Sequence, residues 1–437
     1  MHVGIQTSRR LPVSLFSTIQ IPTTRPCVFL HSFYILINLH CDMTAGSVPA
    51  FVVKYAFLST AIAIGLYAGF IGLLTTDSLQ THVVYLHKIQ MTWFKDLNTP
   101  EVFGFMHNQV TPFGIRSSFG DTVYAWHILP IELYGRNEDF LMGEPSGYCR
   151  DITMRKAFIL LRDDPDARLI IHMHGAAGTV GSGYRVPNYR ALSAGDPNKI
   201  HVLTFDYRGF GRSEGTPTEK GVLEDAISVV QWAIDVARVP PSQILLFGQS
   251  LGAAVNLAVA EHFAIQSPPI VFTGHVLVAP FLDAATLMAS YQIAGTIPLL
   301  GPIARFPLLF GYLQQYLVHR WSNKDRIARY IQANEANQNP YRITIIHAED
   351  DYDVPSTHSR DLFWHAVNAT EATGVTRVEF EQAKLEGAAD LGPAGTVMKW
   401  TTETGIIREE ILKTGLHDVV MGNAVVTRAV MRILAEV

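Results

Sequence analysis

Two serines of the chain stand in the same pattern, Gly-x-Ser-x-Gly, which occurs as GRSEG at residues 211–215 and as GQSLG at residues 248–252. A serine becomes an exposed nucleophile where a strand ends in a sharp turn and a helix begins at once, and only small neighbours fit there. Ser250 follows the apolar strand pattern of residues 244–247 and precedes a helical pattern that opens with small residues. Ser213 lies instead between charged residues in a loop-like stretch. We therefore predict that Ser250 is the nucleophile and that Ser213 is a turn serine.

A serine hydroxyl needs a base that takes its proton and a third group that orients the base. In this strand-turn-helix arrangement the acid and then the histidine follow the serine along the chain. His358 and His365 fall in the helical pattern of residues 355–370, whereas His417 lies in the loop sequence TGLHD before the last helix. A loop just before the last helix can lie next to the ends of the strands, so we predict that His417 is the base.

The acid belongs in the sequence HAEDDYDVP, which follows a predicted strand. Glu349, Asp350, Asp351 and Asp353 compete for the role. Asp351 stands at the turn before a helix that opens with proline, a residue favoured at the first helical position. We predict Asp351 as the acid, with Asp353 as the alternative.

Attack on a carbonyl creates an oxyanion, which backbone amides can stabilise. The amide of Leu251, at the start of the helix after the nucleophile, is one predicted donor. The loop HGAAG at residues 174–178 follows an early strand, and its glycines let the backbone approach closely, so the amide of Ala176 is the other. His172 and His174 share one face of a strand. The sequence offers no third ligand at useful spacing, and we expect neither a metal nor a cofactor.

The elements that must position these residues are visible between residues 120 and 437. Short apolar runs alternate there with longer helical patterns, which predicts an α/β fold with a mostly parallel sheet and helices on both faces. The expected strands are Thr122–Ile128, Arg168–Met173, Ile200–Phe205, Gln243–Phe247, Gly274–Val278, Arg342–His347 and Arg377–Glu381. The expected helices include Thr218–Ala237, Leu251–Ala264, Pro355–Thr370 and Ala424–Ala435.

Two stretches interrupt the alternation. Residues 281–340 are rich in Phe, Leu and Tyr, and we expect an inserted cap of helices there. Phe306, Phe310 and Tyr312 in this cap are candidates for binding substrate, against the alternative that they only cover the sheet. Residues 382–415 form a stretch longer than ordinary loops, and the sequence does not indicate their role.

The composition narrows the class of protein. Of the 437 residues, 48% are apolar and 17% are charged, against about 25% charged residues in an average soluble protein. This excludes a disordered chain and suggests a membrane segment. A net charge of -5 without a long basic run argues against nucleic acid as a partner.

Tyr55–Leu74 carries no charge and is long enough to cross a bilayer as a helix. Basic residues are more frequent before it than after it, so we predict a cytosolic segment over residues 1–54 and a lumenal or exterior catalytic part. Residues 75–119 then form a connector to a domain over residues 120–437. Residues 1–41 contain no acid, and a mitochondrial targeting peptide is the alternative.

Together these motifs resemble the α/β-hydrolase superfamily. The runs HMHGAAGTVGSGYRV, VLTFDYRGFGRSEGTPTEKGV, FGQSLGAAV and IIHAEDDYDVP are similar to the membrane-anchored monoacylglycerol and lysophosphatidylserine lipases of the abhydrolase-domain group. The resemblance covers about residues 120–437. It implies an α/β-hydrolase fold and a serine hydrolase acting on monoacylglycerols or lysophospholipids at the lumenal side of the endoplasmic reticulum. Ala176 stands where that family more often has Asn, and Gln249 where it more often has His.

Two other functions stay open from the sequence. A thioesterase or peptidase would use the same three residues on another acyl substrate, and a binding protein could keep the fold without catalysis. The oligomeric state is not indicated by the sequence.

Overall fold

Residues 49–293 and 296–435 are described by the computed structural model of the chain. The alternative targeting peptide, residues 1–41, lies outside the described residues, as does most of the predicted cytosolic segment, residues 1–54.

Helix α2, Ala50–Leu74, begins five residues before the predicted span and includes Lys54. The chain divides into two compact units, residues 1–69 and 70–437, and most of α2 belongs to the first. Within the described part of the chain, α2 is the one helix long and apolar enough to cross a membrane. Nearly all of its side chains are exposed, and apolar ones surround it on every side, which is typical of a helix in lipid.

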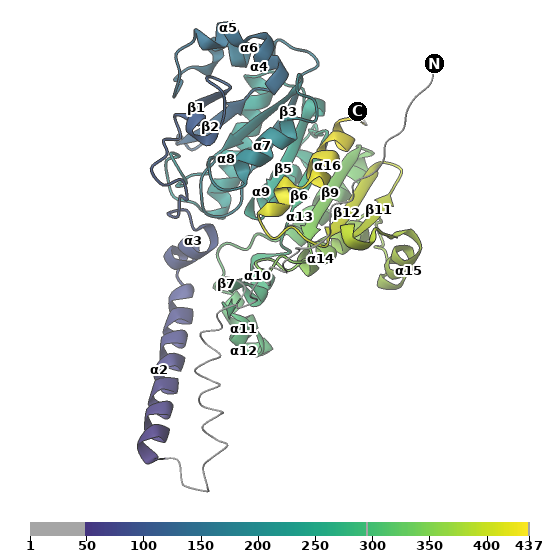
Figure 1. Cartoon of the computed structure of the whole chain (residues 1–437). Coiled ribbons are helices and arrows are strands. Elements are labelled where there is room, and N and C mark those ends of the chain that lie inside the picture. The colour runs from purple at the N-terminus through teal and green to yellow at the C-terminus, as the bar shows by residue number, and fades with distance from the viewer. Residues whose placement is uncertain (1–48, 294–295, 436–437) are drawn as a thin grey trace, which may run out of the picture. The chain divides into compact units, whose positions relative to one another are not determined.

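The second unit is built on one large sheet (Figure 1), with the strand order β1-β2-β4-β3-β5-β6-β9-β12-β11-β10. Neighbouring strands from β4 to β12 are parallel, and the pairs at both edges are antiparallel. The strands are β1 (Val110–Arg116), β2 (Thr122–Ile128), β3 (Arg168–Met173), β4 (Ile200–Phe205), β5 (Ile244–Gln249), β6 (Gly274–Val278), β9 (Tyr341–Ala348), β10 (Ala389–Asp390), β11 (Thr396–Thr401) and β12 (Gly405–Leu412).

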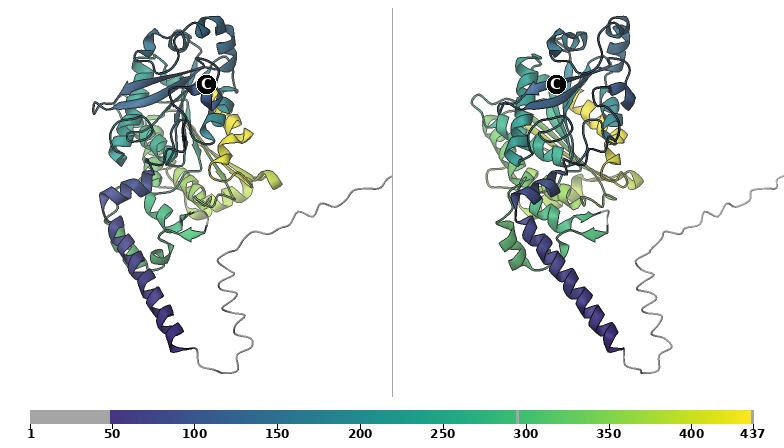
Figure 2. Two further views of the ribbon diagram at one scale, coloured as in Figure 1. Left: turned by 60° about the vertical axis from the view of Figure 1, so that its left-hand side comes forward. Right: turned by 90° about the vertical axis from the view of Figure 1, so that its left-hand side faces the viewer.

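Helices cover the sheet on both faces. Figure 2 shows α16, in yellow, on one side of the strands and α8 and α9, in teal, on the other. The first face carries α7 (Arg185–Ser193) and α16 (Ala424–Ala435), and the second carries α8 (Glu219–Asp235), α9 (Leu251–Ala264), α13 (Asn323–Asn337) and α14 (Thr357–Asn368). The central strands are buried on both faces, which explains their continuous apolar sequences.

The predicted strand at Arg377–Glu381 is wrong, because these residues begin helix α15, Arg377–Gly387. Thr376 and Glu379 form a reciprocal cap, in which each side chain accepts a hydrogen bond from the other's backbone amide. The spacing Thr-x-x-Glu is the sequence signature of this helix start. Residues 382–415 contain the rest of α15 and then strands β10, β11 and β12, which complete the sheet.

The boundaries around the domain also differ from the sequence prediction. The predicted connector, residues 75–119, contains α3 (Asp77–Tyr85) and β1, which pairs with β2. The predicted cap, residues 281–340, ends with α13, which packs against α9 and α14 in the covering layer. Its earlier part is made of α10 (Ala284–Ser290), β7 (Gln292–Ile293), β8 (Ile297–Pro298), α11 (Gly301–Ala304) and α12 (Pro307–Gln314). Three short helices, α4 (Ile131–Arg136), α5 (Glu138–Met142) and α6 (Lys156–Arg162), follow β2.

Candidate active site

Ser250 lies in the turn between β5 and α9, in a backbone conformation with φ 54° and ψ -116°. Residues other than glycine rarely adopt a positive φ, and backbone strain of this kind is frequent at functional sites. The amide of Ser250 donates to the carbonyl of Val278 on β6 at 2.9 Å, which fixes the turn at the end of the sheet. Ser250 is partly exposed, and its hydroxyl has no hydrogen-bond partner among the described residues, His417 included.

The two glycines of the Ser250 motif leave no room for a side chain. A Cβ at Gly252 would lie 1.9 Å from the carbonyl oxygen of Met173, and one at Gly248 would lie 2.2 Å from that of Gly252. Both obstacles are backbone atoms that cannot rotate away. The strand-turn-helix packing therefore requires glycine at both positions.

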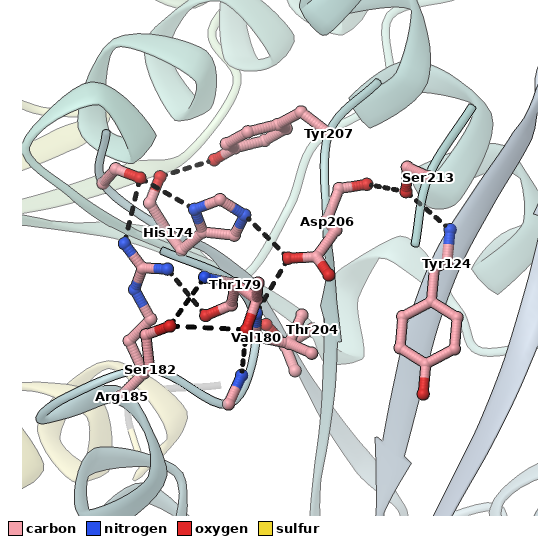
Figure 3. A network of polar contacts seen from close by, with 12 residues as sticks. Tyr124, His174, Thr179, Val180, Ser182, Arg185, Thr204, Asp206, Tyr207 and Ser213 are labelled. Atoms are coloured by element: carbon pink, nitrogen blue, oxygen red, sulfur yellow. Dashed lines mark hydrogen bonds and ion pairs between the residues drawn. The ribbon is translucent and has the colours of Figure 1, made fainter. Parts of the chain in front are cut away.

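Ser213, in the second Gly-x-Ser-x-Gly motif, is only 9% exposed. Its hydroxyl donates to the carbonyl of Asp206 at 2.5 Å and accepts from the amide of Tyr124 at 2.8 Å (Figure 3). These bonds join the loop after β4 to the neighbouring strand β2. Ser213 is thus a structural serine, as the sequence context predicts.

His417 and Asp351 meet at the carboxyl ends of the parallel strands. The Nδ1 atom of His417 donates to Oδ2 of Asp351 at 2.7 Å, and the imidazole is 15% exposed. The Oδ1 atom of Asp351 accepts from the amides of Asp353 and Val354, so the alternative acid contributes its backbone to holding Asp351. His347, at the end of β9, donates from Nε2 to the same Oδ2 at 3.1 Å.

These contacts shift both pKa values toward the ionised forms. Burial alone would raise the pKa of Asp351, but hydrogen bonds from His347 and His417 outweigh it and hold that pKa far below its usual value. Burial alone would lower the pKa of His417, yet the hydrogen bond and charge of Asp351, with the charges of Asp418 and Asp353, raise it above its usual value. The pair can therefore stabilise a proton on His417 during a reaction.

Hydrogen bonds connect the loop that carries His417 to the loop after β9 and to the turn of Ser250. The Oδ1 atom of Asp350 accepts from the amides of Gly415 and Leu416 at 2.8 Å each. The Nε2 atom of Gln249 donates to the carbonyl of His417 at 3.3 Å and to Oδ1 of Asp418 at 3.2 Å. Gln249 directly precedes the candidate nucleophile, so it joins the turn of Ser250 to the loop of the base.

The HGAAG loop packs directly against the same turn. A Cβ added to Gly175 would lie 2.4 Å from Oε1 of Gln249 and 3.4 Å from Cβ of Ser250. The amide of Ala177 donates to the carbonyl of Tyr85 at 2.9 Å, and that of Gly178 to the carbonyl of Ile89 at 2.6 Å. The amide of Ala176, between them and the turn, has no acceptor among the described residues.

The amide of Leu251 is also free of partners within its own helix. Leu251 is the first residue of α9, and the first amides of a helix have no intrahelical acceptor. The positive end of the helix dipole adds to the attraction for an anion there. The two amides predicted as oxyanion donors are therefore uncommitted and lie on segments that touch Ser250.

Arg185 is a part of this site that the sequence did not reveal. This buried guanidinium donates from Nη1 to the carbonyl of Thr179 at 2.6 Å (Figure 3). From Nη2 it donates to the carbonyls of Gly175, Ala176 and Ala177 at 3.1, 3.3 and 2.8 Å. By holding the carbonyls on its own side, the arginine constrains the peptide planes that carry the loop's amides.

Comparison with known proteins agrees with this geometry. The family profile described as "Alpha/beta hydrolase family" matches residues 170–397, just over half of the chain. The chain belongs to the alpha/beta hydrolase family.

Its relatives among curated proteins include "Lysophosphatidylserine lipase ABHD12" of Danio rerio, 26% identical over 302 residues, or 68% of this chain and 69% of that protein. "Protein ABHD12B" of Homo sapiens is 29% identical over 75% of this chain and 82% of its own length. The chain spans about two thirds of the length of the lysophosphatidylserine lipases that it matches.

A solved structure, an alpha-beta hydrolase from Vibrio vulnificus, is 12% identical with a TM-score of 0.50 over 82% of this chain and 92% of that one. This likeness concerns the fold alone. The matches confirm the predicted α/β-hydrolase fold, the resemblance to abhydrolase-domain lipases and the predicted class of serine ester hydrolase.

Two other features of this alpha/beta hydrolase bear on the predictions. His172 is fully buried, its Nε2 lies 3.1 Å from Oδ1 of Asn188, and burial lowers its pKa to about 3. The substrate candidates lie on or beside α12, where Phe306 and Tyr312 are exposed and Phe310 lines an apolar cavity. Their contact with substrate stays a prediction.

Proposed function

We propose that this alpha/beta hydrolase cleaves carboxylic esters of lipids, monoacylglycerols or lysophospholipids, through an acyl-enzyme on Ser250. The observation that carries the proposal is the convergence of three distant segments. The strained turn of Ser250 is hydrogen-bonded through Gln249 to the loop of His417, and His417 is hydrogen-bonded to Asp351.

In the first half of the reaction, His417 takes the proton of the Ser250 hydroxyl as Oγ bonds to the ester carbonyl carbon. The charge that develops on the carbonyl oxygen is stabilised by the amides of Ala176 and Leu251. The ester C–O bond then breaks, and His417 returns the proton to the departing alcohol. Asp351 keeps Nδ1 of His417 protonated, so that Nε2 faces the reaction.

In the second half, water attacks the acyl group on Ser250, with His417 again as the base. The fatty acid leaves and the serine hydroxyl is restored. The raised pKa of His417 suits both halves, because the histidine must hold a proton for part of each one.

The substrate class is supported by the relatives rather than by the chemistry, since the same three residues also cleave thioesters and amides. The relatives are lysophosphatidylserine lipases by name, and the chain carries an apolar helix suited to a membrane. The resemblance to membrane-anchored lipases supports the endoplasmic reticulum as the location of the protein. The basic residues before Tyr55–Leu74 support a catalytic unit on the lumenal side, anchored by this helix.

A fluorophosphonate probe tests the chemistry on the full chain in membranes. We expect the probe to label the natural protein and to lose labelling in Ser250→Ala. The matched variant Ser213→Ala alters the other Gly-x-Ser-x-Gly motif and keeps labelling in its folded fraction. Labelling that persists in Ser250→Ala, or a loss confined to Ser213→Ala, contradicts the proposal.

A substrate panel tests the class. Long-chain lysophosphatidylserine, monoacylglycerol, acyl-coenzyme A and a peptide amide would be compared at equal concentration, and we expect turnover of the first two. Preferred turnover of the thioester or the amide would replace the lipid ester as substrate. Glycosidase treatment and protease protection of membranes would report which side the catalytic unit faces.

A further inference from the structure

The segment between α10 and α13 presents apolar side chains to the outside. Helix α12, Pro307–Gln314, contains no charged residue, and none of its side chains is buried. Leu308 is 92% exposed, and Phe306, Leu309, Tyr312, Tyr316 and Val318 are exposed as well. Soluble proteins rarely leave so many large apolar side chains together in water, and such patches mark binding surfaces.

The other side of α12 is apolar too. Phe310, Leu313 and Leu317 line a small apolar cavity that is partly open to solvent, together with Val84 and Met288. A helix that is apolar on every side belongs in a protein core or in a membrane. Because the inner side of α12 already faces the domain, its outer side needs an apolar partner from elsewhere.

The position of the cavity indicates that partner. Ile71 and Leu74, in the last turn and a half of α2, line the same cavity. Gln80, in α3, donates from Nε2 to the carbonyls of Leu74 and Tyr316 and accepts at Oε1 from the amide of Val318. The end of the apolar helix α2 and the end of the α12 segment are thus fixed to each other through one side chain.

We propose that α12 is a second membrane contact, which lies in the interfacial layer of the bilayer beside the point where α2 leaves it. The exposed tyrosines fit this layer, where aromatic rings with a polar end are enriched. Short interfacial helices bind by burying one apolar face at the boundary of the acyl chains. The inference rests on α2 as the membrane span and goes beyond the proposed hydrolysis.

A second copy of this chain could also cover the patch, but the continuity with α2 favours lipid. Because α2 ends at Leu74, the boundary of a bilayer that α2 spans lies near this residue. Leu74 lines the same cavity as Phe310 on α12. The exposed apolar side chains of α15 provide a comparison with those of α12. On α15, Val378 and Leu385 are 76% and 87% exposed, and that helix carries several charged residues.

The test uses the full chain in phospholipid nanodiscs, with Cys27→Ser and Cys41→Ser so that only the buried Cys149 remains. An environment-sensitive fluorophore is attached at Leu308→Cys, Tyr312→Cys or, as the matched control, Leu385→Cys. We expect emission at the first two sites to rise several-fold and to be quenched by lipids carrying a shallow nitroxide. The Leu385→Cys label should stay in water.

A label at residues 308 and 312 that behaves like the control overturns the proposal. A label that is shielded from water but not quenched by the lipid nitroxide also overturns it, because a protein surface then covers α12. These readouts do not require hydrolysis, so loss of the proposed function would leave them intact.

An activity measurement adds a second arm. Leu308→Glu combined with Leu309→Glu, both exposed on α12 and neither among the substrate-binding candidates, should lower the turnover of bilayer-embedded lysophosphatidylserine about tenfold, whereas hydrolysis of a soluble short-chain p-nitrophenyl ester stays unchanged. Leu385→Glu should change neither rate. Equal loss on both substrates would show damage to the fold and would contradict a role at the membrane surface.

Discussion

The loops after β4 and β5 carry the same five-residue pattern and use it in opposite ways. Around Ser213 the hydroxyl is buried and saturated, with Tyr124 as donor and Asp206 as acceptor. The hydroxyl of Ser250 has no partner among the described residues. The neighbouring Gln249 is hydrogen-bonded to the carbonyl of His417, and the imidazole of His417 is hydrogen-bonded to Asp351. The predicted nucleophile therefore differs from the structural serine by its unpaired hydroxyl, since both stand in the same sequence pattern.

The largest contrast is expected when each serine is removed. Ser250→Ala should lower kcat by at least about 10⁴-fold, because the nucleophile is lost. Ser213→Ala should leave kcat of the folded protein nearly unchanged and lower the free energy of unfolding by about 1–3 kcal/mol, because the amide of Tyr124 and the carbonyl of Asp206 lose their partner. Steady-state kinetics and denaturant unfolding measure both. Similar kcat losses in the two variants would erase the contrast.

The final glycines of the two motifs give the next contrast. Gly252→Ala pushes a Cβ against the carbonyl of Met173, 1.9 Å away, and should cost about 3 kcal/mol or more of stability. At Gly215, with φ 85°, a Cβ meets nothing nearer than 3.4 Å. Gly215→Ala should therefore cost only the strain of a positive φ, about 1–2 kcal/mol. Thermal unfolding of both variants is the measurement, and equal costs would contradict the steric explanation.

Arg185 sharpens the comparison because its guanidinium donates to the HGAAG loop beside Ser250 and makes no hydrogen bond to Ser213. Arg185→Met should lower kcat about 10²-fold with a smaller change in KM, since the carbonyls of residues 175–177 are released and the amide of Ala176 loses its orientation. Ser182→Ala removes a hydrogen bond at Thr179, farther along the same loop, and should spare kcat. Active-site titration corrects both for folded protein. Recovery of part of kcat in Arg185→Lys would agree with a positioning role, and a pure rise in KM would not.

The smallest effect is a shift of pH dependence. His417 must be neutral to act as a base, so kcat/KM falls as pH drops through its pKa. Asp418 raises that pKa, and Asp418→Asn should move the acid limb to lower pH. Glu214→Gln, beside Ser213, removes a carboxylate that accepts from Thr122 and should leave the limb in place. A limb that moves upward in Asp418→Asn would contradict the charge assignment.

Local patterns predicted the centre of the fold well. The strands at Thr122–Ile128, Arg168–Met173, Ile200–Phe205 and Gly274–Val278 have the predicted bounds, because each is a compact apolar run between turn residues. The strand predicted at Arg377 failed because its alternation of apolar and polar residues outweighed the Thr-x-x-Glu cap beside it. Strands β11 and β12 were missed because charged residues interrupt them, and their pairing depends on distant partners.

The residues of the candidate site also divide into those that the sequence predicts and those that it does not. Glycine spacing and the order of elements suffice to select Ser250, Asp351 and His417 as candidates. Sequence reasoning did not find Arg185 and considered Asp350 only as a competing acid, because the partners of both side chains are backbone atoms that no sequence pattern identifies. Side chains that act on carbonyls and amides become visible only when the loops are placed in space.

The hydrogen bonds from Ala177 and Gly178 to Tyr85 and Ile89 bear on how a soluble fragment should be cut. A fragment that starts at residue 120 lacks the carbonyl acceptors of both amides and also lacks the edge strand β1. We expect the HGAAG loop to be less ordered in such a fragment. Starting ahead of Asp77 retains α3 and the tether that follows it. In this hydrolase the segment that follows α2 therefore also holds the loop that carries one of the predicted oxyanion donors.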